Sequence, residues 1–186
     1  MKLFRTNEID TDSFKVGDVI SFTLTDGKEV EAMAVKQEKD GMVFVLVDCL
    51  RDEYSMNEEN TNRGGYEASD LRGKLNNEIL ERFPDEIRKN LIAFENGDLL
   101  RLPSEREIFG EKIYGETEPE TTVQWEPMKL RRNRVAFQGK NGCWEWYWLI
   151  NKVEGSAAYF AIVSDNGGAN FHSASGSLGV RPAFKI

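Results

Sequence analysis

The strongest constraint on the fold is an alternation of apolar and polar residues near the N-terminus. Ile20, Phe22 and Leu24 alternate with Ser and Thr, an Asp-Gly pair follows at residues 26–27, and the alternation resumes over residues 30–34. An apolar side chain at every second position is typical of a β-strand with one covered face, and Asp-Gly is a favoured hairpin turn. Residues 14–50 therefore predict a β-meander.

The third strand of this meander differs from the first two. A second Asp-Gly pair at residues 40–41 precedes an uninterrupted apolar run over residues 42–47. A strand without polar alternation is covered on both faces. We therefore expect the third strand to lie in the centre of its sheet.

Helical periodicity begins after a polar, turn-rich segment at residues 51–66, which we interpret as a long surface loop. Ser69 fits an N-cap, and Asp70 complements the dipole of the first turn. Apolar residues then fall on one helical face as far as Phe83, and Pro84 ends this helix and can begin a shorter one. We expect the first helix to pack on the sheet.

A third, short helix has the clearest local pattern. Ser104 followed by Glu107 forms a capping box, and Gly110 is a stop signal. The acidic and irregular segment that follows, residues 111–124, predicts a second surface loop.

Tryptophans dominate the return of strand patterns in the C-terminal third. Trp144, Trp146 and Trp148 recur at a period of two, which predicts that they share one face of a strand. Such a stripe belongs to a core more often than to a ligand platform. Trp148, near the end of the strand, is the one that could border a binding surface.

Three more strands are predicted after the tryptophans. Residues 159–163 and 169–173 form two of them, joined by an Asn-Gly-Gly turn, and residues 179–186 form a closing strand. Because proline cannot donate to a ladder, Pro182 must lie at an edge or outside the pairing. We expect the closing strand to pair with the N-terminal part of the chain.

β-elements at both ends of the chain, with helices between them, define an α+β protein. A length of 186 residues with 40% hydrophobic content suffices for one core, so we expect a single domain over residues 1–186. Residues 1–50 would form the β-meander, residues 66–110 two or three helices, and residues 125–186 a β-rich, ligand-facing part.

Charge argues against one class of partner. The formal net charge is -8, and residues 1–120 hold 16 Lys and Arg against 28 Asp and Glu, whereas residues 121–186 hold 8 against 4. Phosphate binding requires a positive surface, so we expect no nucleic-acid partner. The basic cluster at residues 128–134 could meet an anionic ligand, but we favour its pairing with the acidic part of the chain.

The sequence also bears on location. No apolar run approaches the roughly 20 residues of a membrane span, and residues 1–14 lack the apolar centre of a signal peptide. We expect a soluble, unexported, cytoplasmic protein without a membrane span. Cys49 and Cys143 lie in apolar or aromatic surroundings, which fits reduced, buried thiols better than a disulfide.

Residues of the common catalytic and metal sites are scarce. His172 is the only histidine, which rules out a His-rich metal site and leaves one candidate general base. The nearby Ser173 and Ser175 come without a nucleophile-elbow motif, and there is no phosphate-binding loop or paired Cys motif. Carboxylates at residues 58–59 and 116–120 lack the spacing of a calcium loop. We predict no cofactor, no metal and no enzymatic activity.

Five segments in a fixed order resemble one family: FKVGD from residue 14, YEASDLRGKLN from 66, LLRLPSEREIFG from 99, YWL from 147 and GVRPAF from 179. They are similar to a large family of uncharacterised bacterial and phage-associated domains that close with Gly-Val-Arg-Pro-Ala-Phe. The ending also resembles that of C-type-lectin-fold proteins, including formylglycine-generating enzymes and the variable proteins of diversity-generating retroelements. The resemblance implies a C-type-lectin-like core whose terminal strands pair.

The same resemblance implies a ligand-binding surface ahead of the closing strand. The corresponding residues are Asp165, Asn166, Asn170, Phe171, His172, Ser173 and Ser175, with Trp148 and Tyr159 nearby. Aromatic and small polar side chains of this kind suit contact with a protein. The segment at residues 148–153 departs from the family's Trp-Leu-Arg-Ser-Pro pattern. The paired cysteines of a formylglycine-generating enzyme are also missing, since Cys143 stands alone in the C-terminal region.

Three functions stay open at this point. We favour a non-catalytic binding module of C-type-lectin-like fold, whose polar C-terminal surface contacts a protein or other macromolecular ligand. The alternatives are a structural or assembly component of a phage or prophage particle, and an enzyme related to formylglycine-generating enzymes that uses Cys143 or His172.

Overall fold

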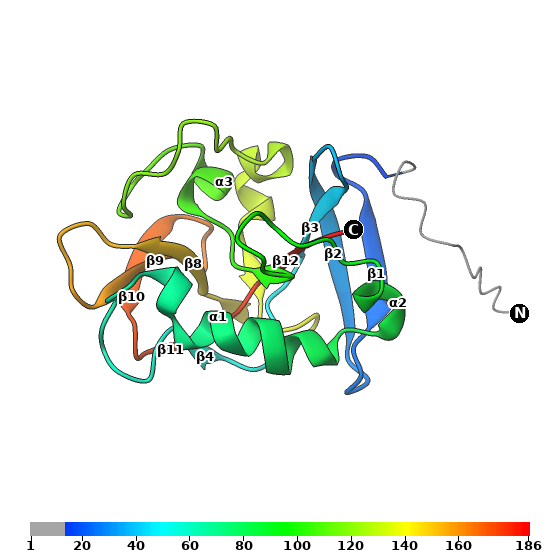
Figure 1. Ribbon diagram of the computed structural model, residues 1–186, viewed down its shortest axis with the longest axis horizontal. Coiled ribbons are helices and arrows are strands. Elements are labelled where there is room, and N and C mark those ends of the chain that lie inside the picture. The colour runs from blue at the N-terminus through cyan, green and yellow to red at the C-terminus, as the bar shows by residue number, and fades with distance from the viewer. Residues whose placement is uncertain (1–13) are drawn as a thin grey trace, which may run out of the picture.

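The computed structural model describes residues 14–186 and confirms an α+β architecture with more strand than helix. Two sheets lie beside one another, with β1–β3 on one side of the molecule and β8–β10 on the other (Figure 1). The expectation about an export signal concerns residues 1–14, nearly all of which lie outside the described residues.

A five-stranded antiparallel sheet contains the predicted meander. In spatial order its strands are β1 (Val19–Thr23), β2 (Glu29–Gln37), β3 (Met42–Leu46), β12 (Ala183–Lys185) and β5 (Leu100–Arg101). Every residue of β3 is buried, and β3 pairs with β2 on one side and β12 on the other. The prediction that the third strand is central is confirmed.

The C-terminal part forms a second sheet of three antiparallel strands. In spatial order they are β10 (Ala169–Ser173), β9 (Tyr159–Val163) and β8 (Tyr147–Lys152). Both strands predicted in residues 159–173, and the turn between them, are confirmed. Two smaller sheets join β4 (Tyr54–Ser55) to β11 (Ser177–Leu178) and β6 (Ala136–Phe137) to β7 (Trp144–Glu145).

The helices follow the capping residues of the sequence. α1 (Asp70–Lys74) begins at Ser69, whose hydroxyl accepts a hydrogen bond from Arg72 N. The helix then continues as a π turn (Leu75–Ile79) and a 3₁₀ turn (Leu80–Arg82), so it is not α-helical throughout. α2 (Asp85–Arg88) follows Pro84 as expected.

The predicted capping box is confirmed in α3 (Glu105–Phe109), where Ser104 and Glu107 exchange backbone and side-chain hydrogen bonds. The helix ends at Gly110, whose φ of 84° is favourable for glycine. Short 3₁₀ turns also occur at Tyr66–Ala68, Glu126–Lys129 and Arg131–Asn133.

Buried apolar side chains form two clusters, one on each side of the sheets. Alternate residues of β3 divide between them, so Phe44 joins the cluster that includes α1, whereas Val45 joins the cluster that includes α3. β8 divides in the same way, with Trp148 in the first cluster and Tyr147 in the second. Both strands therefore bury apolar side chains on both of their faces. Each Å² of apolar surface removed from water stabilises the fold by about 25 cal/mol.

The closing strand is shorter and more central than predicted. Only Ala183–Lys185 form β12, which lies between β3 and β5. Pro182 precedes the strand, so its expected position outside the ladder is confirmed. Ile186 exchanges backbone hydrogen bonds of 2.6 and 3.1 Å with Met42, which attaches the end of this segment to the start of β3.

The segment at residues 51–66 is less exposed than its polar sequence predicts. It contains β4, and Met56 within it is fully buried. The buried side chain of Asn62 donates to the carbonyl oxygens of Ser156 and Tyr159 at 2.8 and 3.0 Å. Side-chain amides thus attach this loop to the C-terminal sheet in place of the apolar contacts that the sequence lacks.

The prediction that three tryptophans share one strand face is wrong. The chain leaves the ladder between β7 and β8, so Trp144 is 66% exposed whereas Trp148 is fully buried. The Nε1 atom of Trp148 donates to the carbonyl oxygen of Tyr54 at 2.7 Å. Trp148 is therefore a core residue, and its assignment to the binding surface is corrected.

Candidate functional site

Three partly exposed aromatic side chains meet at the margin of the β8–β10 sheet. The ring centroid of Phe171 in β10 lies 5.4 Å from that of Tyr159 in β9 and 5.2 Å from that of Tyr114, in the loop after α3. The three side chains, which we call the aromatic cluster, are 36 to 40% exposed. Aromatic residues that touch one another yet stay open to solvent are characteristic of protein-binding surfaces.

The strand register brings two of these residues together. Tyr159 lies opposite Ser173 and Phe171 lies opposite Ala161, so all four project from the same face of the sheet. Tyr159 and Phe171 are diagonal neighbours on that face, a separation that aromatic side chains can bridge. The β9–β10 hairpin thus positions their contact by backbone pairing alone.

A buried carboxylate holds the third member of the cluster. Glu105, at the start of α3, is fully buried and accepts backbone hydrogen bonds from Ile113, Tyr114 and Gly115 at 3.1, 3.0 and 2.8 Å. Bonds from three amides to one carboxylate are charge-assisted and fix the loop strongly. Tyr114 is therefore presented to Phe171 on a rigid support.

The same loop is attached to β8 by its backbone. Glu116 N donates to Lys152 O at 3.1 Å and Glu154 N donates to Tyr114 O at 3.0 Å. Gly115 lies so close to the sheet that a Cβ atom at its position would be 2.4 Å from Cβ of Asn151. Glycine is thus required there by the close approach of two backbones.

The residues expected at the binding surface divide between the two faces of the sheet. Tyr159, Phe171 and Ser173 project from the face of the aromatic cluster, whereas Asn170 and His172 project from the opposite face. Ser175 is exposed in the turn after β10. The structure therefore does not bring these residues together as one surface.

His172 is packed against aromatic side chains. Its ring centroid lies 6.4 Å from that of Trp146 and 6.0 Å from that of Trp148, in both cases edge to face. Its Nδ1 atom lies 3.3 Å from the carbonyl oxygen of Ser173 and 3.5 Å from its hydroxyl oxygen. The side chain fills a space between the tryptophans, and its contacts do not form a catalytic triad.

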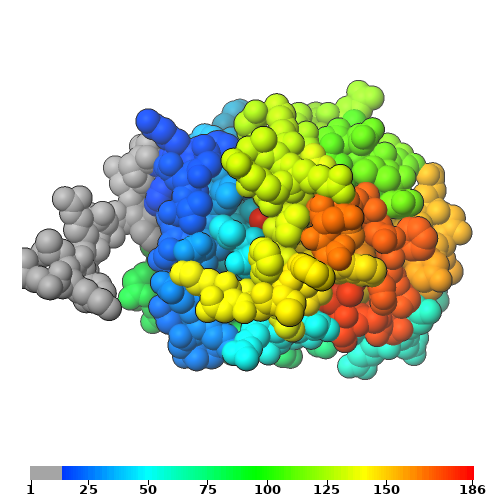
Figure 2. Space-filling model, turned by 180° about the vertical axis from the view of Figure 1, so that it is seen from behind, coloured from blue at the N-terminus to red at the C-terminus, as the bar shows by residue number. Residues whose placement is uncertain are grey.

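Asp165 and Asn166 lie in the β9–β10 turn, at the end of the hairpin away from Tyr159. Asn166 accepts hydrogen bonds from Arg131 at both its carbonyl oxygen (2.8 Å) and Oδ1 (3.0 Å). Its Oδ1 also accepts from Gly168 N at 2.9 Å. Asn166 is therefore engaged in holding the turn. Figure 2 shows the hairpin, in orange to red, as open surface beside the yellow β6–β7 hairpin.

The basic cluster does not pair with the acidic part of the chain, and that prediction is wrong. Arg131 binds the turn at Asn166, and the Nε atom of Arg134 donates to Met128 O at 2.6 Å. Lys129 pairs with Glu126, a neighbour in the same part of the chain. Lys129 and Arg134 thus bind partners within residues 126–134, whereas Arg131 connects this segment to the β9–β10 turn.

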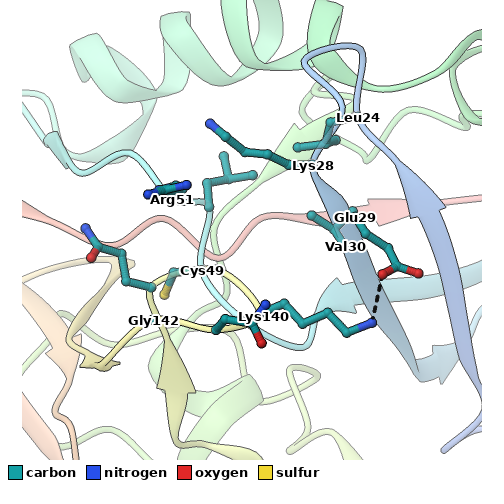
Figure 3. A pocket seen from close by; sticks show the side chains of 12 residues that line it. Leu24, Lys28, Glu29, Val30, Cys49, Arg51, Lys140 and Gly142 are labelled. Atoms are coloured by element: carbon teal, nitrogen blue, oxygen red, sulfur yellow. Dashed lines mark hydrogen bonds and ion pairs between the residues drawn. The ribbon is translucent and has the colours of Figure 1, made fainter.

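A pocket of about 370 Å³ lies between the β1–β2 turn and the loop at residues 138–142 (Figure 3). Lys140 lines it and is already paired with Glu29 at 3.1 Å. Cys49 also lines it but is buried, and this burial raises the pKa of its thiol far above the ordinary value. A protonated thiol is a poor nucleophile, so the pocket does not support thiol chemistry.

Cys143 differs from the prediction, because it is exposed in the loop before β7. Its neighbour Trp144 is also exposed, and β6 and β7 pair over only two residues each. The apolar and aromatic residues that follow Cys143 in the sequence therefore do not bury its side chain.

Residues 14–186 contain neither a group of metal ligands nor a helix that could span a membrane. In this range, no three His, Cys, Asp or Glu side chains are grouped so that they could hold a metal ion. None of the helices in the same range combines the length and apolar character that crossing a membrane requires.

The fold and the site define an α+β protein that presents an exposed aromatic cluster, formed by the β9–β10 hairpin and the loop after α3. The chain belongs to the family described as a domain of unknown function (DUF6273), whose model matches residues 40–186. The matched range begins just before β3 and includes the whole candidate site. Neither the curated proteins nor the solved structures contain a match to the chain.

Proposed function

We propose that this protein is a non-catalytic binding module that contacts a protein or other macromolecular ligand through the aromatic cluster. The observation that carries the proposal is the contact among Tyr114, Tyr159 and Phe171, which remain 36 to 40% exposed. Tyrosine and phenylalanine supply large, rigid contact area with little loss of side-chain entropy. Their exposure in the isolated chain costs free energy that a ligand would recover on binding.

The hydrogen bonds that hold Tyr114 in the aromatic cluster favour the same function. Tyr114 is fixed by the Glu105 carboxylate and by backbone bonds to β8, so little ordering would be needed on binding. Preorganisation of this kind raises affinity by reducing the entropy lost in the complex. By comparison, the enzyme alternative, which uses Cys143 or His172, has weaker support. His172 is packed between tryptophans. Cys143 is exposed in the loop before β7, and no hydrogen bond within residues 14–186 joins it to His172.

The finer parts of the proposal rest on the sequence. The phage association depends on the five segments that resemble one family, and the C-type-lectin-like relationship depends on the Gly-Val-Arg-Pro-Ala-Phe ending. The cytoplasmic location depends on the missing apolar span and signal pattern in the sequence and on the two cysteines. In the structure this ending leads into a strand between β3 and β5, so a C-type-lectin-like core would here close on the third strand of the meander.

The proposal is tested with peptides selected from a displayed random library against the full chain. Their affinity is measured by fluorescence anisotropy for the wild type and for Phe171→Ser and Tyr159→Ser. We expect each substitution to weaken binding at least about tenfold, since truncating a residue at the centre of an interface costs about 2 kcal/mol or more.

Phe137→Ser is the matched control, because Phe137 is 42% exposed and lies on β6, outside the aromatic cluster. This variant should bind with unchanged affinity. If Phe137→Ser loses binding while Phe171→Ser retains it, the ligand binds elsewhere and the proposal is wrong.

A further inference from the structure

β10 and β8 are the two edge strands of the three-stranded sheet, and in the described part of the chain only the β8 edge pairs with other backbone segments. On the β8 side, the backbone of residues 114–116 pairs with the strand, and Gly179 O accepts from Trp148 N at 3.3 Å. On the β10 side, the structure shows no further strand among residues 14–186. One edge is covered and the other is open.

The register decides which groups of β10 face outward. Ala174 N donates to Ala158 O at 2.8 Å, so Asn170 and His172, at even separations before Ala174, direct their backbone groups toward β9. The outward-facing residues are Ala169, Phe171 and Ser173. Every second residue of β10 thus directs its backbone N–H and C=O groups away from β9, as in a strand that has a neighbour on both sides.

Several of these outward groups have no protein partner within residues 14–186. Phe171 N is engaged by the Asn170 side chain at 2.9 Å, and Ser173 O accepts from Gly176 N at 2.9 Å. The Ser173 N–H, the Phe171 carbonyl and both backbone groups of Ala169 remain for an incoming chain. Phe171 thus combines an available carbonyl with a side chain in the aromatic cluster.

The usual protections of a sheet edge are missing from β10. Natural edge strands carry lysine, proline or a bulge that prevents pairing. β10 reads Ala-Asn-Phe-His-Ser, and its five residues pair with β9 in one continuous register. Its backbone is therefore regular enough to template another strand.

The charged residues around β10 indicate which kind of segment could bind at its open edge. Residues 155–180 contain no Lys or Arg, and Asp165 lies in the turn before the strand. At the other end, Asn57 N donates to Ala174 O at 3.0 Å, which places the exposed Glu58 and Glu59 near the end of β10. At the turn, Arg131 bound to Asn166 offsets the charge of Asp165. The acidic end of the open edge is therefore the end near Glu58 and Glu59, and a segment that carries basic residues there complements it.

We propose that the open edge of β10 binds an extended segment of a partner protein, which carries basic and apolar side chains and adds to the sheet as a further strand. Backbone hydrogen bonds would supply affinity, and alternate apolar side chains of the segment would contact the aromatic cluster. This inference rests on the proposed function, because it uses the same surface.

The test uses the full chain and two fluorescein-labelled peptides, one alternating Lys and Val and the other alternating Glu and Val. Anisotropy titrations should show binding of the Lys-Val peptide and at least about tenfold weaker binding of the Glu-Val peptide, equivalent to 1.4 kcal/mol. Ser173→Pro removes an outward N–H while leaving the bonds between β9 and β10 in place. It should weaken the Lys-Val peptide about tenfold, whereas Ser173→Ala should not.

Hydrogen exchange measured by NMR gives a readout that needs no variant. The bound Lys-Val peptide should slow exchange of the Ala169 and Ser173 amides, which face outward. The amides of β1, which is also an edge strand, should exchange at their original rates.

The outcomes separate this inference from the proposed function. Absence of Lys-Val binding, equal binding of both peptides, or binding without protection of Ser173 overturns the inference. Loss of binding in Phe171→Ser with normal binding in Ser173→Pro also overturns it but leaves the proposed function intact. Light scattering that shows a dimer, abolished by Ser173→Pro, would assign the edge to a second copy of the chain instead.

Discussion

Arg181 is a buried cation whose hydrogen bonds all go to neutral acceptors. Its Nε atom donates to Leu46 O at 2.6 Å, and Nη1 donates to Asn133 O at 3.0 Å and to the hydroxyl of Tyr147 at 3.1 Å. The guanidinium also lies 5.3 Å from the ring centroid of Tyr147. One side chain in the closing segment thereby connects β3, β8 and the 3₁₀ turn before β6.

Arg181→Met should destabilise the protein by about 3 kcal/mol, because it leaves buried carbonyl groups without a donor. The free energy of unfolding in urea measures the effect. Arg132→Met, at an exposed position, is the control and should change stability by about 0.5 kcal/mol or less. Equal effects of the two substitutions would show that Arg181 does not connect these elements.

The two cysteines should react at very different rates. Cys143 is exposed, whereas Cys49 is buried and has a raised pKa. With Ellman's reagent at neutral pH, the native protein should therefore titrate one thiol quickly and the second only after unfolding in urea. Cys143→Ser should remove the fast phase and Cys49→Ser should retain it; the reverse pattern would contradict the assigned burial.

At the scale of elements, the loop that carries Tyr114 depends on one close contact. A Cβ atom on residue 115 would lie 2.4 Å from Cβ of Asn151 and 2.9 Å from Oε2 of Glu105. Gly115→Ala should therefore displace the loop, destabilise the protein by about 1–3 kcal/mol and weaken ligand binding through Tyr114.

Gly73→Ala provides the matched control for this loop. Gly73 lies in α1, and no atom would lie within 4 Å of an added Cβ there. Alanine should stabilise the helix by about 1 kcal/mol. Urea unfolding of both variants measures the difference, and similar behaviour of the two would mean that the loop tolerates a side chain at residue 115.

Elements with local signals could be predicted from the sequence, and elements that depend on distant contacts could not. The meander, the α3 capping box and the β9–β10 hairpin each follow from residues a few positions apart. The exposure of Trp144 and Cys143 depends on where β7 ends. In the candidate site, Tyr159 and Phe171 were expected from the family resemblance. Tyr114 was missed, because its position depends on Glu105 and has no periodic signal.

At the scale of the whole molecule, an ion-pair group attaches the last strand to the β2–β3 turn. Lys185 of β12 lies 3.2 Å from Glu38 and 2.9 Å from Asp40. Burial alone would raise the pKa of Glu38, but hydrogen bonds from Lys36 and Lys185 outweigh it and the pKa is lowered. For Asp40, the hydrogen bond from Lys185 is the main cause of a lowered pKa.

The contribution of this ion-pair group to stability should therefore fall as the solution becomes acidic. A carboxyl whose pKa is lower in the folded than in the unfolded state stabilises the fold above its ordinary pKa, near 4, and this contribution is lost as pH falls. This contribution should be lost between about pH 5 and pH 3. In urea unfolding, Lys185→Met should therefore lose less stability than the wild type over this pH range. Lys112→Met, which removes the exposed pair with Glu154, should keep the wild-type slope.

The insertion of β12 between β3 and β5 has a consequence for the order of folding. Phe184 pairs with Phe44, about 140 residues earlier in the chain, and contacts of such long range slow folding because a large loop must close first. A nascent chain that has made β3 but not yet β12 would expose an apolar strand edge, which is prone to aggregation. Folding in the cell should thus be limited by the arrival of one short strand, and a chaperone that shields β3 until then should raise the yield.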